Sequence, residues 1–597
     1  MPTPQSKIRA CLLLAAGAGL LLAYRRIYGG SEANTIPPAL TAQLLLLPLL
    51  LGLSFIAPLQ RGLTLVIDRL RAPRDRGRLI TAGVLALLAT FYLWGSAVLH
   101  WRDLTPRMQD EFSYLIQAQL LSRGKLWVAS PPLADFFETF HLLVKPVYAS
   151  VYFPGTALLY VPGVWFGWSH VATSLLISGA AVGLLYLLVA EVLDGAFGVL
   201  AAVLLLTTTQ FRWTSTLALS NIPAMLAGMI LALAWLRWHR SRGRGWAIVA
   251  GLSAGWGLIV RPLDMIAWLV PIGAMILFDL AREPRARRWS VLLMLAAAVP
   301  FVGLQLAFNK GVTGNVWRTP YQYYFDEFQP NTSLGFADDD PTARPNTTLP
   351  QKLDLYEDFL RPLIRKSRVE MLGQWRLPFL VSATMPSDVL LLLLPVGLAA
   401  AIGNRRWLFA AVPVLFLGLY LLYPYFMPYY PLSIAPAIIV VLLCGLKSVL
   451  FDFCTSRSSG GVVFGMLAVF ALGVAALPEV RLDFAAERDG IPGLGEINTR
   501  LPEMLVPPAV VLFAYTEGTS CHTEPVYNAG VADPLEASII RAHDLGIERN
   551  RELISYFART KPQATFYRYD RGIEQLRRLG TAAELEARGF GHMQAAQ

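Results

Sequence analysis

Charged residues are scarce in this chain of 597 residues: Asp, Glu, Lys and Arg make up 15% of it, whereas hydrophobic residues make up 55%. A soluble globular protein carries about 25% charged residues. The composition therefore excludes a mainly soluble protein, and the mean hydropathy of +0.48 agrees with that conclusion. The sequence predicts an integral membrane protein.

Cysteine is equally rare, with four residues at Cys11, Cys444, Cys454 and Cys521. They fall in or beside different segments, and no pair has the spacing of a metal site or a disulfide framework. The chain also lacks a glycine-rich phosphate loop between a strand and a helix, so a nucleotide-sugar donor has no support. No motif requires a cofactor or a metal site, and a divalent cation is left open as a cofactor.

Long apolar runs are abundant instead. A helix needs about 20 apolar residues to cross a bilayer. We expect about 13 transmembrane helices, near 9–24, 38–58, 79–99, 171–192, 195–210, 221–238, 246–261, 264–280, 289–307, 387–403, 406–423, 431–449 and 461–477. The first run is followed by YRRIYGG rather than a small-residue cleavage site, which favours a retained helix over a removed signal peptide.

The distribution of arginine predicts the orientation of the chain. The formal net charge is +10, and arginines gather in short loops at 61–78, 237–244, 281–288 and 403–406. This pattern is typical of cytoplasmic loops, so nucleic acid is not expected as a partner. We expect a multi-pass protein of the plasma (inner) membrane with a cytoplasmic N-terminus. The polar loops 100–170 and 308–386 and the region from 478 onward are then extracytoplasmic.

One apolar segment, YFPGTALLYVPGVWFGW (152–168), is interrupted by two prolines and two glycines. Counting it as a full span would place the arginines of 237–244 outside, against the charge rule. We interpret it as a re-entrant or interfacial segment. Broken backbone at membrane depth is tolerated only where protein or a water-filled cavity satisfies it, so we expect an outer cavity.

The predicted fold is a polytopic α-helical membrane domain over 1–477, followed by a small extracytoplasmic α/β domain over 478–597. In the second domain, PAVVLFAYTE (508–517) and ATFYRY (564–569) have the pattern of strands. The segment 533–560 has the pattern of one or two helices.

The loop 100–170 carries a predicted amphipathic helix, TPRMQDEFSYLIQAQLLSRGKLW (105–127). Thr105 is suited to the N-cap, Pro106 to the first helical position, and Gly124 to the end. The apolar side is broad, so we expect the helix to lie along the outer membrane surface.

Two adjacent acids, Asp110 and Glu111, lie in the first turns of this helix. Consecutive residues are about 100° apart around a helix, so the two acids should have separate tasks. One would face a cavity and the other would pair with Arg102 or Arg107. Acids near a helix N-terminus also simply complement the helix dipole, and that alternative stays open.

The order of these features resembles the GT-C class of membrane glycosyltransferases, which includes protein O-mannosyltransferases and bacterial lipid A aminoarabinose transferases. The similar stretches cover about 100–450. They are the acid followed by SYLIQAQLLSRGKLW, then VYFPGTALLYVPGVWFG, SAGWGLIVRPLD (253–264) and FNKGVTGNVWRTPYQYY (308–324).

This resemblance implies an inverting glycosyltransferase that uses a sugar carried on a polyprenyl phosphate. The acceptor would be a glycan, lipid or protein at the outer face. Asp110 is implied as the general base that takes the proton of the acceptor hydroxyl, with Glu111 as its neighbour or a metal-facing partner.

The lipid phosphate leaves with negative charge and needs cations. Arg261 in VRPLD and Lys145 in LLVKPVY are the candidates, because both lie beside the expected cavity. Snorkelling of these side chains at the interface would explain them equally well. Arg318 and Arg376 are weaker candidates.

Four further residues are expected to line the substrate site: Tyr114, Gln117, Asn221 and Tyr429. Two of them lie at departures from the family pattern. Relatives often carry an acid near Asn221, and an arginine before a tyrosine where this chain has Met427 and Pro428. An aromatic belt at the membrane interface would also explain Tyr429.

Two other functions stay open. A transporter or flippase of a lipid-linked glycan would need charge in mid-membrane, and ionisable residues within the predicted spans are few. A non-catalytic scaffold would use the outer domain to bind a partner.

Overall fold

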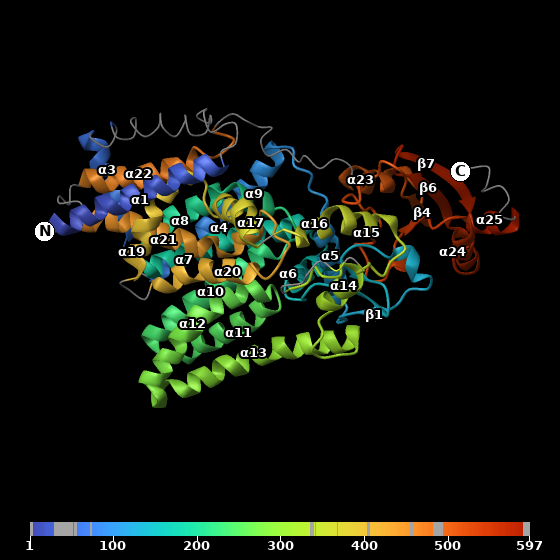
Figure 1. Cartoon of the computed structure of the whole chain (residues 1–597), viewed down its shortest axis with the longest axis horizontal. Helices are drawn as coiled ribbons and strands as arrows, with labels where there is room; N and C mark the ends of the chain where they lie inside the picture. Colours follow the sequence, from blue (N-terminus) through green and yellow to red (C-terminus); the bar gives the residue numbers. More distant parts are fainter. Residues whose placement is uncertain are drawn as a thin grey trace.

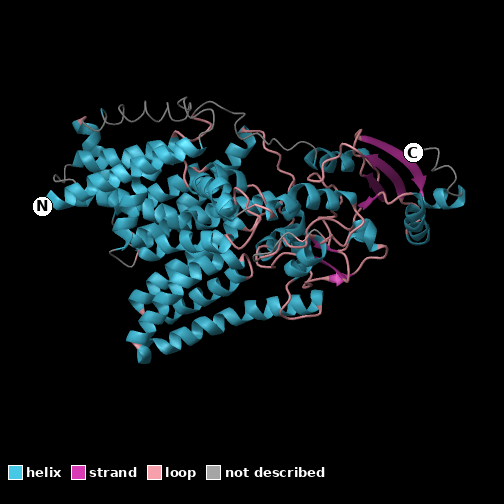
Figure 2. Ribbon diagram, viewed as in Figure 1, coloured by secondary structure: helices cyan, strands magenta, loops and turns pink. Residues whose placement is uncertain are grey.

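The computed structural model describes residues 4–28, 52, 56–71, 75–334, 340, 342–366, 368–402, 406–453, 459–480 and 494–588. Helices form a bundle at one end of the molecule, and the strands of the C-terminal region lie at the other end (Figure 1). Between them lies a region of short helices, loops and a small sheet (Figure 2).

Seven of the described helices are long and apolar enough to cross a membrane. They are α1 (Pro4–Tyr28), α4 (Asp75–Leu99), α7 (His170–Val192), α10 (Asn221–Ser241), α12 (Pro262–Arg282), α13 (Pro284–Thr313) and the continuous segment Tyr430–Phe451, which contains α21 (Ala435–Ser448). Each coincides with a predicted span. The chain is therefore a multi-pass membrane protein.

The other predicted spans correspond to shorter or bent elements. They are α8 (Gly195–Thr207), α11 (Arg244–Leu258), α20 (Trp407–Tyr420) and α22 (Ser459–Val474). The span predicted at 387–403 is half of a helix pair, Arg368–Thr384 and Asp388–Ile402, bent by 96°. The span predicted at 38–58 lies almost entirely outside the described residues. The count of 13 therefore stays a prediction.

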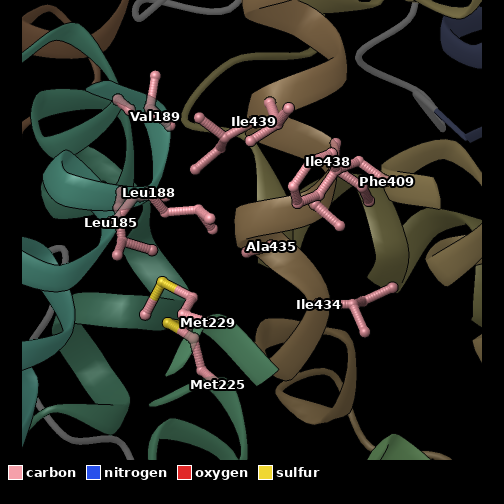
Figure 3. Close-up of a cluster of buried hydrophobic side chains, with 14 of the residues drawn as sticks. Leu185, Leu188, Val189, Met225, Met229, Phe409, Ile434, Ala435, Ile438 and Ile439 are labelled. Atoms are coloured by element: carbon pink, nitrogen blue, oxygen red, sulfur yellow. The ribbon is translucent and has the colours of Figure 1, made fainter. Parts of the chain in front are cut away.

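The centre of the bundle is a close apolar contact between α7, α10 and α21, with α20 beside them (Figure 3). The side chains that meet there are at most 4% exposed; they are Leu185, Leu188, Val189, Met225, Met229, Phe409, Ile434, Ala435, Ile438 and Ile439. In lipid, helices associate mainly through such packing, because the surrounding acyl chains are as apolar as the helices themselves.

Short elements connect the bundle to the C-terminal region or lie along it. They are α3 (Ala57–Arg71), α6 (Ala157–Phe166), α9 (Thr209–Thr214), α14 (Pro320–Phe328), α15 (Pro350–Asp354), α16 (Arg361–Ile364), α17 (Arg368–Met371), α18 (Leu377–Thr384), α19 (Leu394–Ile402) and α23 (Leu494–Met504). With ten residues, α6 is about 15 Å long, too short to span a bilayer. A re-entrant role for 152–168 stays a prediction.

The predicted amphipathic helix forms as α5 (Gln109–Ser122), but it begins later than expected. The expected N-cap, Thr105, donates its backbone N–H and its hydroxyl to the Asp103 carboxylate at 2.9 and 2.7 Å. This local turn occupies the threonine, so Met108 precedes the first helical residue.

The expectation that α5 lies on the membrane surface is wrong, because protein covers it on both sides. Phe112, Ile116 and Leu120 belong to an apolar cluster that contains residues of the C-terminal sheet. Ala118 packs against Ala157 and Tyr160 in another cluster. The broad apolar side thus meets distant segments of the chain rather than lipid.

A small antiparallel sheet follows α5, in the order β1 (Val128–Ala129), β3 (Val147–Ser150) and β2 (Leu142–Leu143). Leu142 is paired with Ser150, and Leu143 with Ala149. This register places the residue before β2 beside the residues that follow β3.

The C-terminal sheet has the strand order β5 (Ile539–His543), β4 (Ala509–Ala514), β6 (Thr565–Asp570) and β7 (Gln575–Thr581). The first three strands are parallel and β7 is antiparallel. The strands expected at 508–517 and 564–569 are confirmed. The segment 533–560, expected to be helical, contains β5 before helix α24 (Ile547–Thr560); α25 (Ala582–Arg588) follows β7.

The bundle depends on glycines where helices touch, and α11 offers a matched pair for testing this. A Cβ added to Gly251 would collide with the Met294 carbonyl of α13, whereas one added to Gly245 would meet open space. We expect Gly251→Ala to destabilise the protein by about 1–3 kcal/mol through overpacking. Gly245→Ala should leave the melting temperature in detergent unchanged, and equal melting of the two variants would refute this packing role.

Candidate functional site

Asp110 lies in the first turn of α5, and its side chain is 22% exposed. The Tyr152 hydroxyl donates to Asp110 Oδ1 at 2.5 Å, and His141 Nδ1 lies 2.9 Å from the same oxygen. Among the described residues, Asp110 Oδ2 has no hydrogen-bond partner. One carboxylate oxygen is thus held, while the other stays available to a ligand.

Strand pairing explains why His141 and Tyr152 meet. His141 precedes β2 and Tyr152 follows β3, and the register of these two strands brings the two residues together. Helix α5 is fixed to the same hairpin: the Ser113 hydroxyl donates to the His141 carbonyl at 2.7 Å, and the Gln117 amide donates to the Tyr152 carbonyl at 2.8 Å. Gln117 therefore holds the backbone of Tyr152 in place.

The backbone of His141 is in the left-handed region, with a φ of 58°. Non-glycine residues rarely adopt this conformation, although histidine is among those that tolerate it better. Here the conformation directs the imidazole towards Asp110, while the His141 carbonyl accepts the backbone N–H of Val151 at 3.2 Å. Contacts on both sides of the residue hold this geometry.

Opposing effects set the charge of Asp110. Burial raises its pKa, but the contacts with His141 and Tyr152 and the positive charge of Arg261 outweigh burial and hold the pKa below its usual value of 3.8. Burial also raises the pKa of Tyr152 well above 10.0, so its hydroxyl stays protonated as a donor. At neutral pH the site contains an ionised carboxylate.

Arg261 precedes α12, and its side chain is 17% exposed. Its Nε donates to Asp264 at 2.9 Å, Nη1 to the Ser220 hydroxyl at 3.0 Å, and Nη2 to the Tyr420 hydroxyl at 2.8 Å. The guanidinium also lies 4.5 Å from the centre of the Tyr430 ring. This network fixes a cation close enough to Asp110 to lower its pKa.

The remaining predicted lining residues also come together here. The Asn221 amide donates to the Tyr429 carbonyl at 3.1 Å, and Asn221 directly follows Ser220, a partner of Arg261. The ring of Tyr114 is stacked on that of Tyr152, with 4.7 Å between centroids. All three predicted residues are at most 5% exposed.

A cavity of about 360 Å³ adjoins this cluster, and its lining includes Trp317, Tyr321, Gln322 and Asp326. Tyr321 also belongs to the site: its ring lies 6.2 Å from that of Tyr152, and its hydroxyl lies 2.5 Å from the Tyr423 hydroxyl. The cavity therefore offers aromatic and polar surface next to the side chain that contacts Asp110.

Glu111 has a different environment from that of its neighbour. Its side chain is fully buried and accepts the backbone N–H groups of Arg107, Met108 and Ala218 at 3.1, 3.2 and 2.9 Å. These bonds close the N-terminus of α5 and join it to the segment before α10. The geometry supports a capping role for Glu111 rather than a catalytic one.

The structure does not bring Lys145 into the site. Its ammonium bonds to Asp135 at 2.5 Å, and the side chain is 62% exposed. Arg318 forms an ion pair with Asp326 in the lining of the cavity beside Tyr321. Arg376 is buried, with Nη2 bonded to the Tyr423 carbonyl at 2.6 Å. Of the predicted cations, Arg261 is the one that contacts the cluster around Asp110.

No set of three His, Cys, Asp or Glu side chains suited to a metal ion occurs within the described ranges. Asp110 is held by His141 and Tyr152, and Asp264 is held by Arg261. The site that these contacts build is one of a carboxylate, a cation and phenols.

Site residues that were not among the sequence-based candidates include His141, Tyr152, Asp264, Tyr321 and Tyr420. Tyr420 donates to Asp264 at 2.6 Å and so completes the network around Arg261. Asp264, three residues after Arg261, could have been found from its spacing at the start of a helix. The others meet through strand pairing and helix packing, for which the sequence carries no local signal.

Residues 151–304 match the family model described as dolichyl-phosphate-mannose-protein mannosyltransferase. This match confirms the resemblance to GT-C membrane glycosyltransferases over about a quarter of the chain. The matched segment contains Tyr152, Asn221 and Arg261, whereas Asp110 lies before it. No curated protein matches the chain.

Solved structures similar to the chain include ArnT from Cupriavidus metallidurans, in the apo state and bound to undecaprenyl phosphate. Both have 12% sequence identity and cover 83% of this chain. The matches include 93% of the apo ArnT chain and 94% of the lipid-bound one, with TM-scores of 0.43 and 0.44. The apo oligosaccharyltransferase from Archaeoglobus fulgidus has 13% identity and a TM-score of 0.34, covering 82% of this chain and 69% of its own.

The two adjacent acids should differ in what they do for stability. Glu111→Ala would leave three backbone N–H groups without their acceptor, and we expect it to cost about 3 kcal/mol or more. Asp110→Asn keeps an acceptor for Tyr152 and should melt close to the wild type. Calorimetry or thermal unfolding in detergent checks both variants, and an Asp110→Asn protein as unstable as Glu111→Ala would contradict the distinction.

Proposed function

We propose that this protein is an inverting glycosyltransferase that moves a sugar from a polyprenyl-phosphate donor, such as undecaprenyl or dolichyl phosphate, to an acceptor hydroxyl. The observation that carries the proposal is the ionised carboxylate of Asp110, which is fixed by His141 and Tyr152 and lies near the cation of Arg261. The family description, which names a dolichyl-phosphate-linked sugar, supports the class of donor.

In the proposed reaction, the oxygen of the acceptor hydroxyl attacks the anomeric carbon while Asp110 Oδ2 accepts the proton of that hydroxyl. A bond forms between the acceptor oxygen and the carbon, and the bond from that carbon to the phosphate oxygen breaks. The electron pair leaves with the lipid phosphate. A single displacement of this kind inverts the anomeric centre.

Arg261 is the proposed partner of the phosphate. Its network with Asp264, Ser220 and Tyr420 fixes the guanidinium before the donor arrives, so little conformational freedom is lost on binding. Arginine is well suited to phosphate because its planar donors match the phosphate oxygens. Asn221, Tyr429 and Tyr114 are proposed to line the sugar and the lipid phosphate around this cation.

The acceptor would enter through the cavity beside Tyr321. Its lining combines the rings of Trp317 and Tyr321 with the polar groups of Gln322 and Asp326. Such a lining suits a glycan, and a lipid or protein carrying a hydroxyl remains an alternative acceptor.

The proposed topology follows the arginine-rich loops. The N-terminus would be cytoplasmic, and the loops 100–170 and 308–386 and the region 478–597 would be extracytoplasmic. The helical domain 1–477 would hold the lipid with 13 spans in the plasma (inner) membrane. Asp110 and Arg261 would then face the outer side, where the acceptor is available.

Sugar transfer by the purified protein in nanodiscs tests this function. We would offer a panel of polyprenyl-phosphate sugars with mixed cell-envelope acceptors. Asp110→Asn should lower the rate by at least about 100-fold, because a positioned general base contributes 100-fold or more. Asp68→Asn, which changes a carboxylate of α3 that is 59% exposed, serves as the matched control and should keep its activity.

The outcomes separate the alternatives. Equal rates in the wild type and Asp110→Asn would remove Asp110 as the base. Movement of a lipid-linked glycan across the bilayer, without turnover of any donor, would favour a transporter or flippase instead. A similar loss of activity in Asp68→Asn would contradict a specific role of Asp110.

The pH dependence of the rate reports the charge of the base. Because the pKa of Asp110 is held below 3.8, the rate should stay constant from neutral pH down to about pH 4 and fall only below it. His141→Gln removes a contact that lowers the pKa of Asp110, so the fall of the rate at acidic pH should begin at a higher pH. His522→Gln, at an exposed histidine, is the control; a fall that begins at the same pH in His141→Gln would contradict the assignment.

A further inference from the structure

We propose that the C-terminal α/β region is a positioning element for the reaction centre, and that Tyr527 is the residue through which it acts. Tyr527 joins the segment that carries Asp110 to the segment that carries His141. The inference rests on the proposed function in one respect: the effect on turnover requires Asp110 to be the base.

Tyr527 contacts both segments with a single side chain that is 2% exposed. Its ring is stacked on that of Phe112, with 4.4 Å between centroids and 5° between planes. Its hydroxyl donates to the Phe140 carbonyl at 3.1 Å. Phe112 lies two residues after Asp110, and Phe140 directly precedes His141. Tyr527, from the C-terminal region, therefore helps to set the distance between the Asp110 carboxylate and the His141 imidazole.

A second contact holds the same segment from strand β5. His543 Nε2 lies 2.5 Å from the Glu138 carbonyl, and His543 Nδ1 lies 3.3 Å from the Gln351 amide nitrogen. Two carbonyls of the stretch 138–140 are thus bound by residues that follow position 520. The Glu138 carboxylate is bound separately, by Lys352 at 2.9 Å and by Thr347 at 2.7 Å.

A buried ion pair fixes the segment that carries Tyr527. Arg571 Nη1 donates to Glu524 Oε2 at 3.1 Å, and the two side chains are 5% and 1% exposed. The Gln351 amide donates to the same Glu524 oxygen at 3.1 Å. Glu524 Oε1 accepts the backbone N–H of Val526, the residue before Tyr527, at 3.0 Å. The position of Tyr527 is therefore fixed on its own side as well.

The conformation of His141 explains why such support is needed. Its φ of 58° is uncommon for a residue with a side chain and persists only where neighbouring contacts hold it. Ser113 and Val151 bind the His141 carbonyl from one side. Tyr527 binds the preceding carbonyl, so loss of its hydroxyl should let His141 move away from Asp110.

A simpler role is that Tyr527 only covers the apolar side of α5. Tyr527→Phe separates the two roles, because it keeps the ring on Phe112 and removes the hydroxyl bond to Phe140. Ser555→Ala is the control: Ser555 also belongs to the C-terminal region, and the hydroxyl that it loses donates at 2.7 Å to Glu586 of α25.

The experiment uses the full-length protein in nanodiscs. Hydrogen exchange of the backbone amides in 138–143 is measured for the wild type and both variants, together with kcat and the KM for the donor. We expect faster exchange and a two- to tenfold lower kcat in Tyr527→Phe, with an unchanged KM, as estimated from the loss of about one hydrogen bond. Ser555→Ala should match the wild type in all three quantities.

Unchanged exchange in Tyr527→Phe would overturn the proposal, and so would faster exchange with an unchanged kcat. A rise in KM at constant kcat would also overturn it, because it would indicate a binding role. If the wild type transfers no sugar from any donor, the proposed function fails, whereas the exchange measurement still decides whether Tyr527 holds the segment before His141.

Discussion

The contact between His141 Nδ1 and Asp110 Oδ1, at 2.9 Å, joins helix α5 to the hairpin of β2 and β3 at the candidate site. Asp110 comes from a helix, His141 from the edge of a small sheet, and Arg261 from the start of a long apolar helix. A carboxylate in a partly buried site needs such partners, because burial alone would neutralise it. The surrounding loops and strands hold these partners in place.

The two adjacent acids, Asp110 and Glu111, lie in the same turn of α5 but have different hydrogen-bond partners. Glu111 points inwards, where three backbone amides bind it, and it joins α5 to the segment before α10. Asp110 points towards side chains instead, and one of its oxygens remains open. Both are carboxylates at the same helix end, and the difference lies in the kind of donor that each one meets.

Much of the membrane domain could be predicted, because apolar length and arginine position act locally along the chain. The acid and Arg261 could also be found from the order of motifs. His141 and Tyr152 could not, since pairing of β2 with β3 brings them together. Strand β5 was taken for helix, because IIRAH is a short apolar run between helix-like segments. The surface position of α5 was wrong because its cover comes from residues about 400 positions later.

The apolar cluster shared by α5 and the C-terminal sheet also bears on the order in which the molecule is assembled. Phe112, Ile116 and Leu120 are translated early, but Val510, Ile540 and Phe566 must be made before these side chains are fully covered. Until then α5 has an exposed apolar side and an incomplete set of partners. The apolar side of α5 is therefore covered in full only after the region that follows residue 508 has been made.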